Sequence, residues 1–212
     1  MNACKTALSA IRGKAVIGLT GPIASGKSLA LACFIKEGAC GISTDAVTAE
    51  LLTTPEIYHT ISKKFGPNKI LTNGLLDKKK LAAEIFNSPA KRKWLESLLH
   101  PEILKRTRSL ITRSKSKFAV VETPLLFEAG LAQCFTFTVC LAAPGKLLEA
   151  RALKRGWSRA QYRARVKAQL GAVQKYARAD IVLDNSGAPE KLAEKIRFIC
   201  RFLTETAKAK KK

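Results

Sequence analysis

Histidine, paired cysteines and long apolar runs are all scarce in this sequence of 212 residues. It contains two histidines and six cysteines, and no two cysteines form a Cys-x-x-Cys pair, which argues against a structural zinc site. No apolar run approaches the roughly 20 residues that a helix needs to cross a bilayer, so we expect no membrane partner. Internal repeats and low-complexity linkers are also absent, which favours one interleaved unit.

The cysteines and the N-terminal region bear on the cellular compartment. Several cysteines lie in apolar runs, as Cys140 does in residues 138–141, where cysteine packs as a small buried hydrophobe. The apolar stretch of residues 15–20 follows basic residues, as in a signal peptide, but it is too short for one and is better explained as a first strand. We therefore expect reduced thiols in a cytoplasmic protein.

Acidic residues are outnumbered, with 16 Asp and Glu against 38 Lys and Arg, which gives a formal net charge of +22. A field this positive attracts polyanions such as nucleic acids, anionic membranes and phosphorylated metabolites. The basic residues are spread from Lys5 to Lys212, which favours a general excess of charge over a nucleic-acid-binding patch. We therefore expect no nucleic-acid partner.

Short apolar runs predict buried strands. The run at residues 15–20 ends at Gly21, and a helical pattern over residues 28–37 separates it from a second run at 40–43. Strand, loop, helix and strand in this order form the start of a doubly wound parallel sheet. Further apolar runs predict strands over residues 118–122, 135–141 and 180–184.

The remaining segments carry helical patterns. Between residues 55 and 113 these patterns are broken by Gly66-Pro67, Asn73-Gly74 and Ser88-Pro89, and no strand signal of comparable strength interrupts them. We therefore expect a helical subdomain inserted between strands. Helices are predicted over residues 46–52, 57–65, 77–86, 90–99, 146–178 and 189–206.

Residues 21–28 read Gly-Pro-Ile-Ala-Ser-Gly-Lys-Ser and match the phosphate-loop pattern G-x-x-x-x-G-K-[S/T]. Glycine is needed in such a loop because backbone N–H groups must converge on phosphate oxygens where a Cβ would clash. Lys27 would place a cation on the β- and γ-phosphates, and the Ser28 hydroxyl can bind Mg²⁺. Because a strand precedes the loop and a helix follows it, we expect a binding site for ATP with Mg²⁺.

Further segments follow the loop in the order that is found in one family. Residues 18–28 are similar to that family's GLTGGIGSGKS, residues 41–45 to its VIDAD segment and residues 121–128 to VxDxPLLFE. The series also includes Leu-His-Pro-Glu-Ile at 99–103 and Ala-Asp-Ile-Val-Leu-Asp-Asn-Ser-Gly at 179–187. The chain thereby resembles the dephospho-CoA kinases, which use ATP to phosphorylate the ribose 3′-hydroxyl of dephospho-CoA and give coenzyme A and ADP.

Five positions depart from the family's motifs. Ser43 replaces the first Asp of the Asp-Ala-Asp segment, and Pro22 and Ala24 replace two glycines of the loop. Leu29 stands where a Thr is usual, and Glu122 where an Asp is usual. Because the other loop glycines, the lysine and the serine are intact, we expect a working phosphate site with a slightly altered backbone path.

The resemblance implies an α/β fold, with a parallel sheet of the P-loop NTPase type flanked by helices, a helical acceptor-binding subdomain and a small helical lid. We expect one domain over residues 1–212, as a monomer or weak homo-oligomer. Its parts would be a core of about residues 13–45, 116–150 and 178–206, an acceptor subdomain of about 46–113, a lid of about 150–177 and a basic tail of 207–212.

The resemblance also assigns catalytic and acceptor-side residues. Asp45, just beyond the second predicted strand, would take the proton from the acceptor hydroxyl, although an Asp in this place can equally cap a helix. Lys27 and Arg151 are the other catalytic candidates. Dephospho-CoA would be bound by Asp45, His100 and Lys175, although His100 fits a hydrogen-bonded histidine at a helix junction just as well.

Nucleotide and metal candidates follow from the loop and the lid. Arg151 and Arg155 lie four residues apart on one face of a predicted helix, so two guanidinium groups could reach the same triphosphate. Glu122 ends a predicted buried strand, where it could bind Mg²⁺ together with Ser28. The nucleotide-binding candidates are Gly21, Ala24, Ser25, Gly26, Lys27, Ser28, Leu29, Arg151, Arg155 and Asn185.

Two alternative functions stay open. Another P-loop nucleoside or nucleotide kinase would share the loop, the Mg²⁺ and the lid but would act on a different acceptor. A catalytically impaired, basic ATP-binding protein that binds nucleic acid would account for Ser43, Ala24 and the charge of +22. The segment between Asp45 and Pro101 separates the first alternative from the leading interpretation, because it carries the acceptor-side resemblance.

Overall fold

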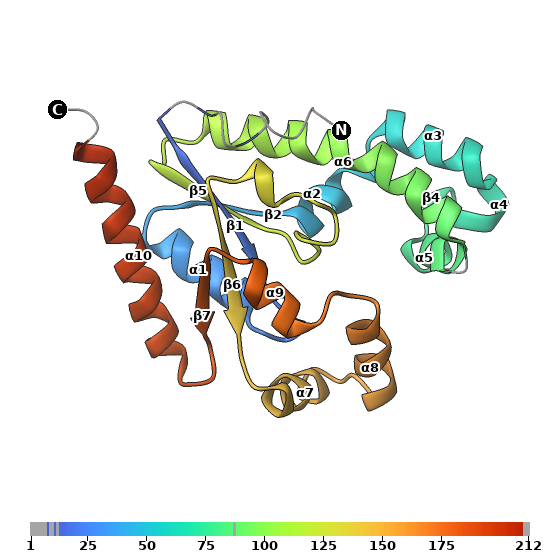
Figure 1. Ribbon diagram of the computed structural model, residues 1–212. Coiled ribbons are helices and arrows are strands. Elements are labelled where there is room, and N and C mark those ends of the chain that lie inside the picture. The colour runs from blue at the N-terminus through green and yellow to red at the C-terminus, as the bar shows by residue number, and fades with distance from the viewer. Residues whose placement is uncertain (1–7, 9–10, 12, 87, 210–212) are drawn as a thin grey trace. The chain divides into compact units, whose positions relative to one another are not determined.

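The computed structural model describes Leu8, Ile11 and residues 13–86 and 88–209 (Figure 1). The chain divides into two compact units. One consists of residues up to Ser43 and from Leu110 onward, and the other is Thr44–Ser109. Each unit has a buried apolar cluster of its own.

The first unit is built on a five-stranded sheet with the strand order β2-β5-β1-β6-β7. Every strand pair in this sheet is parallel. β5 is buried along its whole length and β1 from its second residue on, as expected for strands that are covered on both faces. The strands are β1 (Ala15–Thr20), β2 (Cys40–Ser43), β5 (Phe118–Glu122), β6 (Phe137–Ala142) and β7 (Ile181–Asp184).

The carboxyl ends of these strands meet at one edge of the sheet. Ser43 pairs with Glu122, Ala142 pairs with Asp184, and the central strand β1 ends at Thr20. From β1 the chain goes to β2, beyond β5 on one side, whereas β6 and β7 lie on the other side of β1. β1 is therefore the point at which the strand order reverses, where open parallel sheets bind their ligands.

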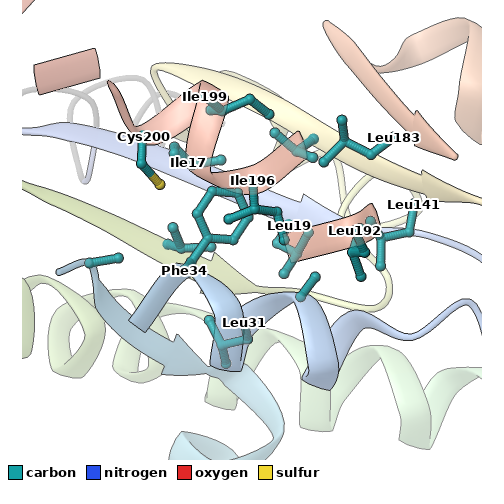
Figure 2. Packing of buried hydrophobic residues seen from close by; sticks show 14 of the residues in the cluster. Ile17, Leu19, Leu31, Phe34, Leu141, Leu183, Leu192, Ile196, Ile199 and Cys200 are labelled. Atoms are coloured by element: carbon teal, nitrogen blue, oxygen red, sulfur yellow. The ribbon is translucent and has the colours of Figure 1, made fainter. Parts of the chain in front are cut away.

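Two helices of the first unit, α1 and α10, enclose its apolar core against the sheet (Figure 2). Phe34 of α1 and Ile196 of α10 are fully buried in this cluster together with Ile17 and Leu19 of β1. This packing fixes the direction of α1 and therefore of the loop that precedes it. The helices of this unit are α1 (Lys27–Lys36), α7 (Gly145–Lys154), α8 (Arg159–Lys167), α9 (Ala172–Arg178) and α10 (Pro189–Ala209), with a 3-10 turn at Ala132–Cys134.

The second unit is mainly helical, as the sequence predicts. Ile61 and Ile70 are fully buried in its core, and the ring of Phe65 meets that of Trp94 edge to face. The elements are α2 (Thr44–Leu51), α3 (Pro55–Phe65), α4 (Pro67–Ile70), β3 (Leu71–Thr72), β4 (Leu75–Leu76), α5 (Lys78–Phe86) and α6 (Pro89–Arg113). The end of α6, from Leu110 onward, belongs to the first unit.

Two features of this segment differ from the prediction. β3 and β4 form an antiparallel hairpin across Asn73 and Gly74, whose φ angles of 52° and 75° suit a tight hairpin turn. Strands of two residues are too short to leave an alternating pattern, so the sequence showed only a break. α6 also continues through Pro101 instead of ending at residue 99. Leu99 and Ile103 pack in the same cluster on either side of the proline, which offsets its missing hydrogen bond.

The segment predicted as one helical stretch over residues 146–178 contains three helices. Gly156, with φ of 84°, follows the end of α7. Ser158 then caps α8, accepting a hydrogen bond from Gln161 N while the Gln161 side chain accepts one from Ser158 N. Smaller differences are a strand over 137–142 instead of 135–141 and a last helix that reaches Ala209 instead of 206.

The prediction of reduced thiols is correct for Cys33, Cys40, Cys140 and Cys200 and wrong for Cys134, which is disulfide-bonded. The remaining cysteine, Cys4, lies outside the described residues. Among the described helices, none combines the length and the apolar character that a membrane span requires.

Candidate active site

The loop between β1 and α1 has a backbone path that requires its glycines. Gly21 and Gly26 have φ angles of 150° and 94°, which side-chain-bearing residues rarely adopt. A Cβ at Gly21 would lie 2.7 Å from Ser25 Oγ, and one at Gly26 would lie 2.3 Å from Asn185 Nδ2. Both positions therefore exclude any larger residue, as the phosphate-loop pattern predicts.

Ala24 shows how the loop tolerates one of its unusual residues. It is buried, and its φ of 62° lies in the left-handed region. An alanine there costs roughly 1 kcal/mol relative to glycine. The loop thus keeps the conformation that glycine would favour and accepts some strain.

The end of the loop combines a helix N-terminus with a cation. Gly26 is the N-cap of α1 and makes no side-chain capping hydrogen bond, so the first amides of α1 are not capped by a side chain. Lys27 Nζ donates to Gly21 O at 3.1 Å and to Pro22 O at 3.0 Å, so its ammonium group lies against the loop. Amides and an ammonium group gathered in this way suit the oxygens of a polyphosphate.

A hydroxyl and a carboxylate meet beside the loop. Ser28 Oγ donates to Glu122 Oε1 at 3.3 Å, and Glu122 is buried at the carboxyl end of β5. Both groups offer the oxygen ligands that Mg²⁺ prefers. No cluster of three or more His, Cys, Asp or Glu that could hold a metal exists within the described part of the chain. Ser28 and Glu122 therefore fit a Mg²⁺ ion that takes its other ligands from phosphate and water.

Asn185 holds the loop from the neighbouring edge of the sheet. Its side chain is almost completely buried, and Nδ2 donates to Ser25 O at 2.8 Å. Its backbone N donates to Ala142 O at 2.7 Å, and its carbonyl oxygen accepts a hydrogen bond from Arg151 Nη2 at 2.9 Å. The predicted contact of Asn185 with nucleotide stays a prediction, since the structure places its amide against the loop backbone.

The two arginines predicted to share a triphosphate differ in their surroundings. Arg151 is half-buried in α7, and its Nη1 is buried without a hydrogen-bond partner among the described residues. Arg155 is exposed and is the C-cap of α7, with its N–H bonded to Ala152 O. Arg151 therefore has a donor that an anionic ligand could satisfy, whereas Arg155 marks the end of the helix.

Lys175 is not exposed to solvent. Its side chain is 0% exposed, and Nζ lies 2.9 Å from Glu128 Oε1, 2.9 Å from Pro124 O and 3.2 Å from Gln169 Oε1. These three protein acceptors occupy the ammonium group of Lys175, and its predicted contact with substrate stays a prediction. Sequence reasoning missed this network, since nothing in the local pattern connects Glu128 with residues 169–175.

Cys140 is buried in β6, where the charges of Lys175 and Lys27 act on its thiol. Burial raises the pKa of the Cys140 thiol to about 11, although Lys175 and Lys27 act in the opposite direction. The thiol therefore stays protonated near neutral pH, where a reactive cysteine would need to be a thiolate.

The remaining predicted residues are Leu29, Asp45 and His100. Leu29 is 42% exposed on α1, directly after Ser28, the last residue of the candidate phosphate loop. Asp45 and His100 belong to the second unit. Asp45 is exposed in the first turn of α2, and His100 is half-buried in α6 beside Pro101. The structure thus brings together the loop, Glu122, Arg151 and Asn185 in the first unit.

Comparison with known proteins gives a consistent result. A sequence model of the dephospho-CoA kinase family matches residues 15–190. The chain is 38% identical over 186 residues to a dephospho-CoA kinase of Anaeromyxobacter dehalogenans, an overlap of 85% of this chain and 88% of that protein. A dephospho-CoA kinase of Mycobacterium tuberculosis is 36% identical over 186 residues, which cover 86% of this chain and 46% of that protein. The chain thus spans about half the length of the mycobacterial relative.

A solved structure shares the fold as well. A crystal structure from Thermus thermophilus is similar with a TM-score of 0.80 and 32% sequence identity, covering 92% of this chain and 98% of that one. The family match includes the phosphate loop and extends beyond Asn185, so it covers the residues that form the site. The family model and the relatives match most of the chain, and the sheet carries the loop at the predicted place. The chain therefore belongs to the dephospho-CoA kinase family.

Proposed function

We propose that this protein transfers the γ-phosphoryl group of ATP to the ribose 3′-hydroxyl of dephospho-CoA, giving coenzyme A and ADP. The observation that carries the proposal is the pairing of Ser28 Oγ with buried Glu122 at the mouth of an intact phosphate loop. This pair would hold Mg²⁺ next to the phosphates that the loop binds, and phosphoryl transfer requires a metal ion in that place. The acceptor is inferred from the family.

The proposed phosphate contacts come from the first unit. The amides at the start of α1 and the Lys27 ammonium group would bind the β- and γ-phosphates. Arg151, whose Nη1 has no hydrogen-bond partner among the described residues, would bind a phosphate oxygen and offset the charge that develops during transfer. Mg²⁺ held by Ser28 and Glu122 would neutralise charge on the same oxygens. These residues would position the phosphate groups and compensate their negative charge.

The proposed acceptor chemistry comes from the second unit. The 3′-hydroxyl oxygen would form a bond to the γ-phosphorus while the bond between that phosphorus and the β–γ bridging oxygen breaks, and ADP leaves. Asp45 is our candidate for the base that accepts the hydroxyl proton. It is exposed in the first turn of α2, directly after β2, so a bound substrate could reach it. His100 would contribute to acceptor binding.

A coupled assay of ADP release tests the acceptor. Dephospho-CoA is compared with adenosine, AMP and phosphopantetheine at equal concentrations, with Mg²⁺ present and then chelated. Turnover with dephospho-CoA that is lost on chelation is the expected result. Turnover with AMP and none with dephospho-CoA would favour another P-loop kinase, and ATP binding without any turnover would favour the impaired ATP-binding protein.

The assembly and compartment belong to the same proposal. We infer a monomer or weak homo-oligomer that works in the cytoplasm. We also infer that it has no nucleic-acid partner, because the basic residues are spread along the chain and not gathered in one segment. Size-exclusion chromatography with light scattering tests the assembly. Retention of duplex DNA or RNA at physiological salt, in a form that competes with ATP, would overturn the last point.

A further inference from the structure

We propose that Glu128 and Lys175 are positioning residues, which anchor the connection between α8 and α9 to the segment that follows β5 and thereby hold α8 in place for nucleotide binding. This inference rests on the proposed function, because it assigns these residues a task in binding ATP. It gives them a role that does not require contact with substrate.

Lys175 has every hydrogen-bonding group occupied inside the protein. An ammonium group has three donors, and Nζ of Lys175 lies within hydrogen-bonding distance of Glu128 Oε1 at 2.9 Å, Pro124 O at 2.9 Å and Gln169 Oε1 at 3.2 Å. The side chain is 0% exposed. A charged group is buried at such a cost that it needs pairing of this kind. The arrangement is a closed site and leaves no donor for a ligand.

Glu128 ties the same site to the backbone of the connection. Its Oε1 accepts a hydrogen bond from Leu170 N at 2.9 Å in addition to the contact with Lys175. Gln169 contributes its side chain to Lys175. Residues 169 and 170, which join α8 to α9, are thus both held by this network. We call Glu128, Gln169, Leu170 and Lys175 the hinge anchor.

Helix α8 is held by few buried contacts in the part of the chain that the structure describes. None of its residues is buried, and it carries four basic residues and the 41% exposed Val166. Two of its side chains reach back towards α7, with Arg159 Nε 3.4 Å from Glu149 Oε1 and the Arg165 guanidinium 4.5 Å from the ring of Trp157. The hinge anchor fixes the opposite end. Loss of the anchor would therefore leave α8 attached on one side only.

The hinge anchor also reaches the strand that leads into the phosphate loop. Pro124 O accepts a hydrogen bond from Lys175 and a second from Thr20 Oγ1 at 3.3 Å. Thr20 is the residue before Gly21, and Pro124 follows Glu122 by two residues. One buried ammonium group therefore connects the entry to the loop, the segment after the candidate Mg²⁺ residue and the end of α8. This connection is the physical route by which the anchor would affect ATP.

The test uses Glu128→Gln together with Lys175→Met, which removes both charges and keeps side-chain size. The readouts are the dissociation constant for a fluorescent ATP analogue and hydrogen exchange of the Leu170 amide. We expect a dissociation constant raised about tenfold and exchange at Leu170 accelerated at least tenfold, at temperatures where the variant stays folded. A dissociation constant within twofold of the parent with unchanged exchange would overturn the proposal.

Two further variants separate positioning from general stability. Glu37→Gln with Arg197→Met removes another ion pair of the first unit, at 3.2 Å between α1 and α10. It should lower the melting temperature without altering ATP binding, and equal losses of ATP binding would contradict the proposal. If the double variant of the anchor does not fold, Gln169→Ala removes one neutral acceptor and should raise the dissociation constant about threefold. An unchanged constant in Gln169→Ala would then refute the anchor.

Neither readout depends on the acceptor. If dephospho-CoA is not phosphorylated, the proposed function fails while ATP binding and exchange at Leu170 still decide the hinge anchor. If dephospho-CoA is phosphorylated and the anchor variants bind ATP normally, the anchor fails alone.

Discussion

The two units of the chain hold their polar groups in different ways. Among the buried polar residues of the described chain, all but Thr107 belong to the first unit. There, the Asn185 side chain donates a hydrogen bond to the backbone of the phosphate loop, and the Lys175 ammonium group donates one to the backbone of the turn after β5. In the second unit the core is apolar, and the candidate base Asp45 is exposed on a helix.

The difference indicates a division of work. Buried hydrogen bonds fix backbone positions, and a phosphate site made of backbone amides depends on such positions. A base that must meet a substrate hydroxyl needs an accessible side chain instead. Loss of these buried hydrogen bonds in the first unit should therefore weaken ATP binding, whereas changes in the second unit should alter transfer or stability and leave ATP binding intact.

The largest effect is expected from Asp45→Asn. Removing the base should lower turnover with dephospho-CoA by about 100- to 10,000-fold, the range for general acid–base catalysis. ATP affinity, measured by titration calorimetry, should stay within twofold. Glu50→Gln in the same helix is the control and should keep near-normal turnover. Near-normal turnover of Asp45→Asn itself would show that Asp45 is not the base.

Asn185→Ala, a change in the first unit, should weaken ATP binding. The change leaves the buried Ser25 carbonyl oxygen without its donor, which costs about 1–3 kcal/mol, or about 5- to 150-fold in affinity. Part of the loss should appear in KM for ATP, with KM for dephospho-CoA little changed. Ser186→Ala changes the exposed neighbour and should have no such effect. Comparable losses in both variants would contradict a specific role of the amide.

Leu99→Ala should destabilise the second unit without removing the phosphate site. Leu99 is buried in the apolar cluster of that unit, and truncation of such a leucine costs about 2–5 kcal/mol of unfolding free energy. Differential scanning calorimetry should show a lower melting temperature, while ATP binding well below that temperature persists. Leu75→Ala, at a 73% exposed position, is the control. A similar loss of ATP binding in Leu99→Ala would contradict the claim that the second unit does not determine ATP binding.

The smallest effect is expected from Ala24→Gly. Glycine removes the left-handed strain at φ of 62°, but it also adds conformational freedom to the unfolded chain. The net gain in stability should be less than about 1 kcal/mol, measured by urea unfolding. Ala32→Gly, at an exposed position inside α1, should instead destabilise by about 1 kcal/mol. An equal loss in both variants would show that Ala24 is not strained.

The sequence predicts some features of the fold and of the candidate site better than others. The strands at 15–20, 40–43 and 118–122 are found at the predicted residues, because buried parallel strands are continuous apolar runs. Ser28 and Glu122 lie side by side, because Glu122 ends β5 and Ser28 lies in the first turn of α1, beyond the loop that follows the adjacent strand β1. Their role in binding Mg²⁺ stays a prediction. The hairpin at Asn73–Gly74 was missed because its strands have two residues each.

The buried polar contacts could not be predicted. Asn185 and Lys175 were assigned to ligand contacts from their positions in family motifs. The partners that they have in the structure, Ser25 and Glu128, are 160 and 47 residues away in the chain. Such contacts depend on the assembled sheet, and neither periodicity nor composition encodes them.

The most direct test of the central claim is the identity of the phosphorylated product. The protein is incubated with ATP, Mg²⁺ and dephospho-CoA, and the product is examined by ³¹P NMR and mass spectrometry. The account predicts one added phosphate as a monoester on the ribose 3′-oxygen, with an equal amount of ADP. ADP formation without a phosphorylated dephospho-CoA, or phosphate on another oxygen, would contradict it.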